Sequence, residues 1–391
     1  MERPVNSVAQ FLLLGVVHAS IFAGVVVYTP RKASLLRLAA ALPLAVLTRC
    51  IYLSGARFFS STQLRVLGPL IWNHYLSLID LMLITRVDAS ELTRLARHQG
   101  AAQPLWEALR LFFNLRRINT KWEVRGVSRP RKPQGRAQFV AWAAVKTLLT
   151  STAIDAILRL PPKPEPHLMA PGKETLYAFW NLSVEDAIVR LSVVLLFAVV
   201  ASLSATCMYY LAATIMVATG MSELDSWPPI FGPIASAHTV RGLWSQCWHQ
   251  LLRNSVSVHG NFISDRILSL QRGTFLSRFA RLFFPFLISG ALHWVMEFEM
   301  DGLEEGRFGV VTFFLLQPLG IMLEGAIQAL VGPSLPKSLR YVIGYTWVAA
   351  WFWWSMAPFG YEQYRTNPLL IWPPSRWFTS PSSGLVNLIN K

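Results

Sequence analysis

The chain is dominated by long apolar runs separated by polar segments. A membrane-spanning helix needs about 20 consecutive, mostly apolar residues, and eight runs approach that length. They lie at 9–28, 35–53, 66–86, 137–158, 187–219, 282–299, 309–331 and 340–358. The pattern predicts an all-α polytopic membrane protein with about eight transmembrane helices. We expect one membrane-embedded domain over residues 1–391.

The run at 187–219 is long for one span, and the number of helices in it decides the topology. The loop 87–136 carries eleven Lys and Arg against four acidic residues, and the loop 220–281 is also basic. The positive-inside rule places both loops in the cytosol, whereas the acidic segment 297–305 fits the opposite side. Two spans within 187–219 would place the two basic loops on opposite sides of the membrane. We therefore expect one long helix there, and both chain termini in the lumen.

Composition agrees with a membrane protein and narrows its partners. Hydrophobic residues make up 53% of the chain and charged residues only 15%, with a net charge of +15. A basic excess marks cytosolic loops, and it can also hold an anionic headgroup or coenzyme A. No soluble domain is available for nucleic acid. The widely spaced Cys50, Cys207 and Cys247 predict neither a disulfide framework nor a zinc site.

One imidazole interrupts the apolar run FPFLISGALHWVMEFEM at 284–300. Ionisable residues within spans usually face the bundle interior and are candidates for function. The small residues Ser289, Gly290 and Ala291 precede His293, so they leave room for a ligand or for a close helix. His293 is therefore a candidate general base. The alternative is a structural hydrogen bond to a neighbouring helix.

A second polar pattern lies in WPPIFGPIASAHTVRGLWSQCWHQLLRNS, residues 227–255. Its Pro-rich first half cannot form a regular helix, and the helical pattern starts at Val240. Arg241, Ser245, His249 and Arg253 then recur at every fourth position, beside the apolar face of Trp244 and Trp248. This spacing predicts an amphipathic helix at the cytosolic membrane interface. In the simplest interpretation that helix is only a surface anchor.

Several of these segments resemble one known family. RGLWSQCWHQLLR resembles the Phe/Leu-Trp-x-x-x-Trp-His-Gln block of the wax-synthase-like branch of membrane-bound O-acyltransferases. SGALHWV is similar to the second block of that family, and its His lies 44 residues after the first. NLRRINTKWEVRGV, residues 114–127, is similar to an upstream segment of fungal members, and WPPIFG also fits. The resemblance covers roughly 110–300 and is specific as an ordered set.

The resemblance implies an acyl-CoA-dependent O-acyltransferase, with acetyl-CoA as co-substrate and no bound cofactor or metal. It implies that His293 is the general base and that His249 orients the thioester and the developing oxyanion. The residues expected to bind substrate or coenzyme A are Trp244, Trp248, Gln250, Arg241 and Arg253. The acceptor implied by the fungal relatives is a lipophilic terpenoid or meroterpenoid alcohol. The membrane implied is the endoplasmic reticulum.

Three alternatives stay open. A wax-ester synthase would join a long-chain acyl group to a fatty alcohol. A transporter of a lipophilic compound would place His293 in a proton or ligand pathway, although the repeat symmetry and paired broken helices of transporters are not visible. A terpene cyclase would need acids inside spans, for which Asp80, Asp155 and Glu324 are the candidates. Glycosylation at the Asn181 sequon is also left open.

Overall fold

The fold is all-helical in the part of the chain that the structure describes. This computed structural model describes residues 4–57, 59, 61–95, 103–129, 135–158, 164–301, 308–331 and 336–366. The long helices are α1 (Pro4–Tyr28), α2 (Ser34–Gly55), α3 (Ser61–Ile79), α6 (Arg136–Leu158), α7 (Val184–Ala218), α10 (Phe275–Asp301), α11 (Gly309–Val331) and α12 (Lys337–Ser355). Backbone groups in hydrocarbon must bond within their own segment, which is why the apolar runs form helices.

Shorter elements connect these helices. The α-helices are α4 (Ala89–Leu95), α5 (Gln103–Phe112), α8 (Val240–Gly242), α9 (Arg253–Phe262) and α13 (Ala357–Thr366). The π-helical turns are η1 (Asp80–Ile84), η6 (Leu243–Cys247) and η7 (Ile263–Ile267). The 3₁₀ turns are η2 (Pro166–Met169), η3 (Phe179–Asn181), η4 (Leu224–Ser226) and η5 (Ile234–His238).

Seven helices in the described ranges are long and apolar enough to cross a membrane. They correspond to the first seven expected runs. The eighth run, 340–358, forms α12, which is not among these seven. Four Trp and two Tyr reduce its apolar character, and such amphipathic rings suit a membrane interface.

Helices α12 and α13 nevertheless carry the chain from one end of the bundle to the other. In the middle of α12, the Tyr345 hydroxyl donates to the Ile234 carbonyl at 3.1 Å. In α13, Glu362 accepts the Gly309 backbone N–H at 3.0 Å, at the start of α11. Length and composition thus support seven spans among the described residues, and a crossing by α12 stays a prediction.

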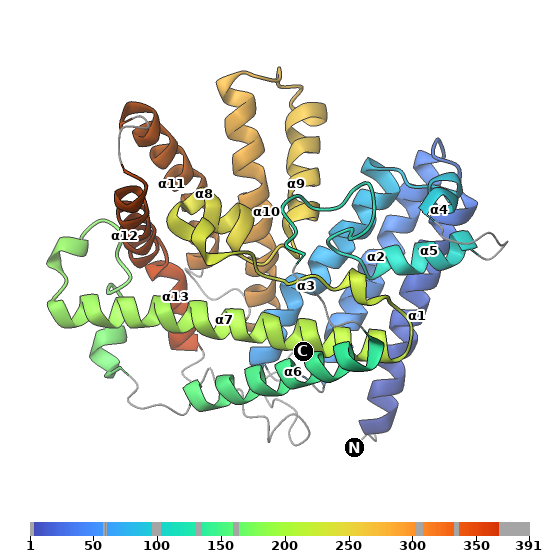
Figure 1. The fold of residues 1–391 in the computed structure, drawn as a ribbon, viewed down its shortest axis with the longest axis horizontal. Coiled ribbons are helices and arrows are strands. Elements are labelled where there is room, and N and C mark those ends of the chain that lie inside the picture. Colours follow the sequence, from blue (N-terminus) through green and yellow to red (C-terminus); the bar gives the residue numbers. More distant parts are fainter. Residues whose placement is uncertain are drawn as a thin grey trace.

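The predicted single helix at 187–219 is confirmed. Helix α7 is continuous over 35 residues, which is about 52 Å at 1.5 Å per residue. That length exceeds the roughly 30 Å hydrocarbon core, so a helix of this length tilts or projects from the bilayer. Figure 1 shows α7 and its partner α6 running across the other long helices.

Contacts join the loops on each of two faces of the bundle. On the face expected to be cytosolic, Arg31 in the α1–α2 loop pairs with Asp88 at 2.8 Å, and Arg253 donates to the Arg125 carbonyl at 2.8 Å. On the opposite face, Arg365 pairs with Glu174 at 2.7 Å. Much of the acidic segment 297–305 lies outside the described residues.

Candidate active site

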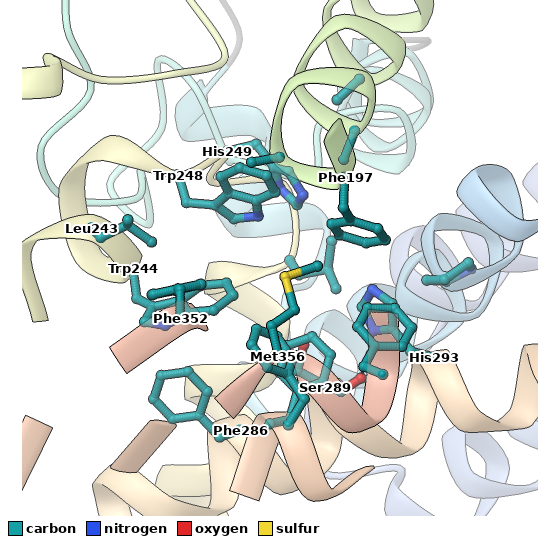
Figure 2. A pocket seen from close by; sticks show the side chains of 18 of the residues that line it. Phe197, Leu243, Trp244, Trp248, His249, Phe286, Ser289, His293, Phe352 and Met356 are labelled. Carbon is teal, nitrogen blue, oxygen red and sulfur yellow. Dashed lines mark hydrogen bonds between the residues drawn. The ribbon is translucent and has the colours of Figure 1, made fainter. Parts of the chain in front are cut away.

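A cavity of about 550 Å³ lies between α3, α7, η6 and α9–α13. Most of its wall is apolar and aromatic. Figure 2 shows Trp248 and His249 on one side of it and His293 with Ser289 on another. Met356 and Phe197 lie between the two histidines in this view. The two imidazoles that the sequence singled out therefore share one chamber.

Helix α10 contributes a regular stripe to the cavity wall. Its members are Arg281, Pro285, Ser289, His293 and Glu297, at every fourth position. Residues four apart lie on the same helix face, so the chamber follows α10 for about 24 Å from the first member to the last. The stripe orders the chamber: a cation at one end, a carboxylate at the other, and His293 one turn from the carboxylate.

The His293 ring is fixed by its own helix. Its Nδ1 lies 2.7 Å from the Ser289 carbonyl oxygen. A carbonyl can only accept, so Nδ1 carries the proton and Nε2 of the neutral ring carries the lone pair. Phe314 packs against the ring with centroids 4.8 Å apart. The geometry leaves a basic nitrogen in a chamber with few polar neighbours.

His249 lies in a non-helical stretch, and this corrects the sequence prediction. The expected helix from Val240 stops at Trp248, which is extended with ψ 154° while its N–H donates to the Leu243 carbonyl at 2.7 Å. The predicted stripe of every fourth residue is therefore wrong beyond Ser245. The break turns His249 to the cavity instead of the helix surface.

Hydrogen bonds from residues outside the helix satisfy the carbonyls at its end. The Ser245 carbonyl accepts from the Gln250 amide at 2.9 Å and from the Arg253 guanidinium at 2.6 Å. The Cys247 carbonyl accepts the Gly232 backbone N–H at 2.9 Å. A Cβ at Gly232 would lie 2.0 Å from the Gln246 carbonyl oxygen, so only glycine allows this approach. These bonds satisfy carbonyls that a helix end otherwise leaves orphaned.

The upstream segment 114–127 holds the Pro-rich segment 227–233 in place. The Arg116 guanidinium donates to the Pro228 carbonyl at 2.5 Å, the Pro229 carbonyl at 2.7 Å and the Tyr209 hydroxyl at 2.5 Å. Phe231, two residues beyond Pro229, then packs on the His249 ring with centroids 6.1 Å apart. Sequence segments far apart in the chain are thereby joined at the site.

His249 is neutral at physiological pH. Burial lowers its pKa to about 4, and the nearby His293 contributes to the shift. Its Nδ1 is buried and has no hydrogen-bond partner among the described residues. A neutral imidazole carries one N–H and one lone pair, so His249 can donate one hydrogen bond without bringing a charge into the chamber.

The remaining predicted residues divide between the cavity wall and its support. Trp244, Trp248, Arg241 and Arg253 line the cavity. The Trp244 indole also donates to the buried Gln317 amide at 3.2 Å, which fixes it among the helices. Gln250 does not line the cavity; it is buried and braces the helix end described above. Arg253 lines the cavity and also braces the helix end, because it donates to the Gln250 amide oxygen at 2.9 Å.

Cations gather where the cavity meets the face of the basic loops. A second hollow of about 460 Å³ shares Arg241, Arg281 and Leu282 with the first and adds Arg278. Arg281 is held by Asp265 and Asn261, whereas Arg241 and Arg278 are exposed. Sequence reasoning missed Arg278 and Arg281. The spacing of Arg281 to His293, three steps of four residues, was the available signal.

The acids considered for a cyclase lie elsewhere. Asp80 is buried 3.4 Å from Arg117, and Glu324 accepts the Val240 backbone N–H at 2.6 Å. Neither these residues nor Asp155 line the cavity. Within the described ranges, no three His, Cys, Asp or Glu side chains are grouped so that they could hold a metal ion.

Comparisons with known proteins agree on one family. The model of the membrane bound O-acyl transferase family matches residues 227–316, which include both histidines. Acetyltransferase ataH of Aspergillus terreus is 31% identical over 62% of this chain and 84% of its own length. Acetyltransferase atnC of Arthrinium sp is 27% identical over 96% of this chain and 90% of its own.

Another relative is acetyltransferase aurG of Calcarisporium arbuscula, 28% identical over 67% of each chain. No solved structure matches. The relatives align along most of the chain, and the family model covers the segment that carries η6, α9, α10 and both histidines of the cavity. The chain therefore belongs to the membrane-bound O-acyltransferase family and is an O-acyltransferase, similar to fungal acetyltransferases.

Proposed function

We propose that the enzyme transfers an acetyl group from acetyl-CoA to a hydroxyl of a lipophilic terpenoid or meroterpenoid, with His293 as general base. The observation that carries the proposal is the fixed tautomer of His293, whose Nε2 lone pair lies in an apolar chamber bordered by cations. The printed names of the relatives support acetyl as the group transferred. The apolar wall supports a lipophilic acceptor.

The reaction needs no covalent enzyme intermediate. Nε2 of His293 removes the hydroxyl proton as the acceptor oxygen attacks the thioester carbonyl carbon. General base catalysis of this kind contributes roughly 10²–10⁴ in rate. The carbon–sulfur bond then breaks, and the His293 imidazolium returns the proton to the leaving thiolate of coenzyme A. Ester and free coenzyme A are the products.

Charge develops on the thioester oxygen during the attack. Neutral His249 and the Trp248 indole are the donors proposed for this oxyanion, because both line the chamber. Donors already positioned in a dry site stabilise such charge more than donors in water do. The pKa of His249, about 4, keeps its donor neutral while the reaction proceeds.

Coenzyme A is proposed to enter from the face of the basic loops. Arg241 and Arg278 are the exposed cations there, and guanidinium groups bind phosphate well. Arg253 is proposed to position the helix end and not to bind phosphate, because its guanidinium already donates to three oxygens there. The endoplasmic reticulum is the membrane proposed, and no nucleic acid partner is proposed.

The acceptor is proposed to enter from the bilayer across α7. Leu191 and Leu195 line the cavity, yet they are 43% and 56% exposed on the helix surface. Side chains that border both the chamber and the lipid-facing surface mark a route for an apolar molecule. The transporter alternative has no support from the relatives, which are named as acetyltransferases.

Labelled acetyl-CoA and microsomes test the proposal. Yeast microsomes with wild type or His293→Ala would receive isotope-labelled acetyl-CoA and a panel of terpenoid and fatty alcohols, and labelled ester would be followed by mass spectrometry. We expect terpenoid acetate from wild type and none from His293→Ala, at equal protein level. Ester formed only from fatty alcohols, or only with palmitoyl-CoA, would instead assign wax-ester synthesis.

His259→Ala is the matched control. His259 on α9 makes the same local bond, from Nδ1 to the Ser255 carbonyl at 2.8 Å, but it does not line the cavity. We expect this variant to keep its activity. Equal loss in both variants, or loss of the His293→Ala protein from the membrane, would assign His293 a structural role.

A further inference from the structure

The end of the cavity away from Arg241 and Arg281 is polar, although most of the wall is apolar. Arg65 of α3, Glu297 of α10 and Gln363 of α13 line the cavity. Leu64, next to Arg65, packs in one cluster with Met296, next to Glu297, which places Arg65 at the same end. We call these three side chains the far-end polar group. They come from three helices that meet at this end of the chamber, and none of them belongs to the sequence motifs that indicated the family.

The position of the far-end polar group follows from the stripe on α10. Glu297 is the last member of the stripe, four residues after His293. Four residues along a helix are about 6 Å. The Gln363 amide donates to the Glu297 carboxylate, which ties α13 to α10 at this point. A polar wall thus lies one helical turn beyond the nitrogen proposed to take the proton.

A carboxylate is costly to place in an apolar chamber. Glu297 is 6% exposed, and a buried charge is tolerated only with hydrogen-bonding partners. A carboxylate, an amide and a guanidinium together offer both acceptors and donors to a molecule in the chamber. A saturated fatty alcohol has only a hydrocarbon chain to present beyond its hydroxyl. Such a chain would remove water from these groups and return no bond.

Resting on the proposed function, we propose that the far-end polar group binds a second hydroxyl of the acceptor, about one helical turn from the hydroxyl that is acetylated. The second hydroxyl donates to the Glu297 carboxylate and accepts from the Gln363 amide or the Arg65 guanidinium. The acceptor class is then an apolar diol or polyol, not a simple long-chain alcohol. The same contacts select which hydroxyl of the acceptor lies at His293.

Three rigid acceptors with one carbon skeleton test this proposal. The first is a fused-ring alcohol with one hydroxyl. The second carries another hydroxyl across one six-membered ring, and the third carries a ketone at that position. We expect wild type to prefer the diol over the mono-alcohol by roughly tenfold to hundredfold in kcat/KM, the range of a hydrogen bond to a charged group.

Glu297→Gln keeps the shape of the side chain. It replaces a carboxylate, which only accepts hydrogen bonds, by an amide, which both accepts and donates them. We expect this variant to lose most of the preference for the diol and to use the keto-alcohol better relative to the diol than wild type does. Gln363→Leu should also reduce the preference for the diol. Ser257→Ala, which changes a polar residue elsewhere in the cavity wall, should keep the wild-type ratio.

The outcomes separate this proposal from the proposed function. Equal kcat/KM of wild type for diol and mono-alcohol would overturn the inference, and so would an equal loss for all three acceptors in Glu297→Gln. Either result would mean that the far-end polar group only holds the helices together at this end of the chamber and does not bind the acceptor. No acetyl ester from any acceptor, with wild-type protein shown in the membrane, would instead overturn the proposed function itself.

Discussion

His293 and His259 show that a residue's local bonds do not define its role. Each donates Nδ1–H to the carbonyl four residues earlier, at 2.7 and 2.8 Å. This bond fixes the tautomer of both rings. The difference is the surroundings of the other nitrogen, since only His293 lines the large cavity. A basic nitrogen becomes useful where a substrate can reach it.

The buried state of His249 predicts an acid sensitivity of folding. Its pKa falls from 6.5 to about 4 in the folded state, so the unfolded chain binds the proton first. Stability is then lost as pH falls from about 6.5 toward 4, and the loss between about pH 7 and 5 is about 2 kcal/mol. Thermal unfolding in detergent at both pH values would measure it in wild type and His249→Phe.

The variant cannot bind this proton, so its stability should fall less over the same range. The comparison between the two proteins cancels the carboxylates that also titrate at low pH. Parallel pH profiles for the two proteins would show that His249 is not held neutral by burial.

At the scale of elements, the segment around His249 shows what the sequence could not predict. The spacing predicted a helix from Val240 correctly as far as Cys247, because local apolar and polar positions recur with the helical period. No Pro or Gly lies between Leu243 and Arg253 to announce the stop. The stop depends on Gly232, more than ten residues upstream. Local patterns do not contain such a tertiary bond.

The rest of the site was predictable only where the signal lies in the local sequence. His293 lies in an apolar run and in a block that resembles the family. Nearby residues therefore predict both the helix that carries His293 and its role as a candidate general base. The resemblance implies that Gln250 binds substrate or coenzyme A, whereas in the structure its amide braces the helix end. Gln363 and Arg65 reach the cavity only through helix packing, and no pattern in their own segments distinguishes them.

Gly232→Ala is expected to disrupt the helix end. The added Cβ would lie 2.0 Å from the Gln246 carbonyl oxygen, where backbone must move. Displacing Gly232 also breaks its bond to the Cys247 carbonyl, so His249 loses its position. We expect a loss of acetyl transfer of at least tenfold, which is about 1.4 kcal/mol in the barrier, together with a lower melting temperature.

Gly24→Ala is the comparison for this prediction. Gly24 lies in α1 with nothing within 4 Å of an added Cβ. An alanine there should leave activity unchanged, and alanine favours a helix over glycine. Equal activity of Gly232→Ala and Gly24→Ala would contradict the role assigned to the helix end.

At the scale of the whole molecule, contacts between loops support the sidedness that charge predicted. The α1–α2 loop contacts the first basic loop through Arg31 and Asp88. The first basic loop contacts the second through Arg116 and Arg253. The opposite face is tied by Arg365 and Glu174. The assignment of the first face to the cytosol stays a prediction from the positive-inside rule.

Cysteine labelling in sealed microsomes, whose outer face is cytosolic, would test that assignment. Arg94 is 73% exposed on the first face, and Tyr177 is 83% exposed on the other. We expect an impermeant maleimide to label Arg94→Cys directly and Tyr177→Cys only after permeabilisation, with the native cysteines replaced. Labelling in the reverse order would show that the first face lies in the lumen, and coenzyme A would then enter from the lumen.

The size of the cavity has a further consequence for selectivity. In the direct transfer proposed above, one chamber of about 550 Å³ holds the acyl group, the reacting end of the donor and the acceptor together. Their volumes are therefore not independent, since each occupant reduces the room for the others. A bulky ring system leaves space for a short acyl group, and a long acyl chain would exclude it. Donor length and acceptor size are then selected as a pair, without a residue dedicated to either.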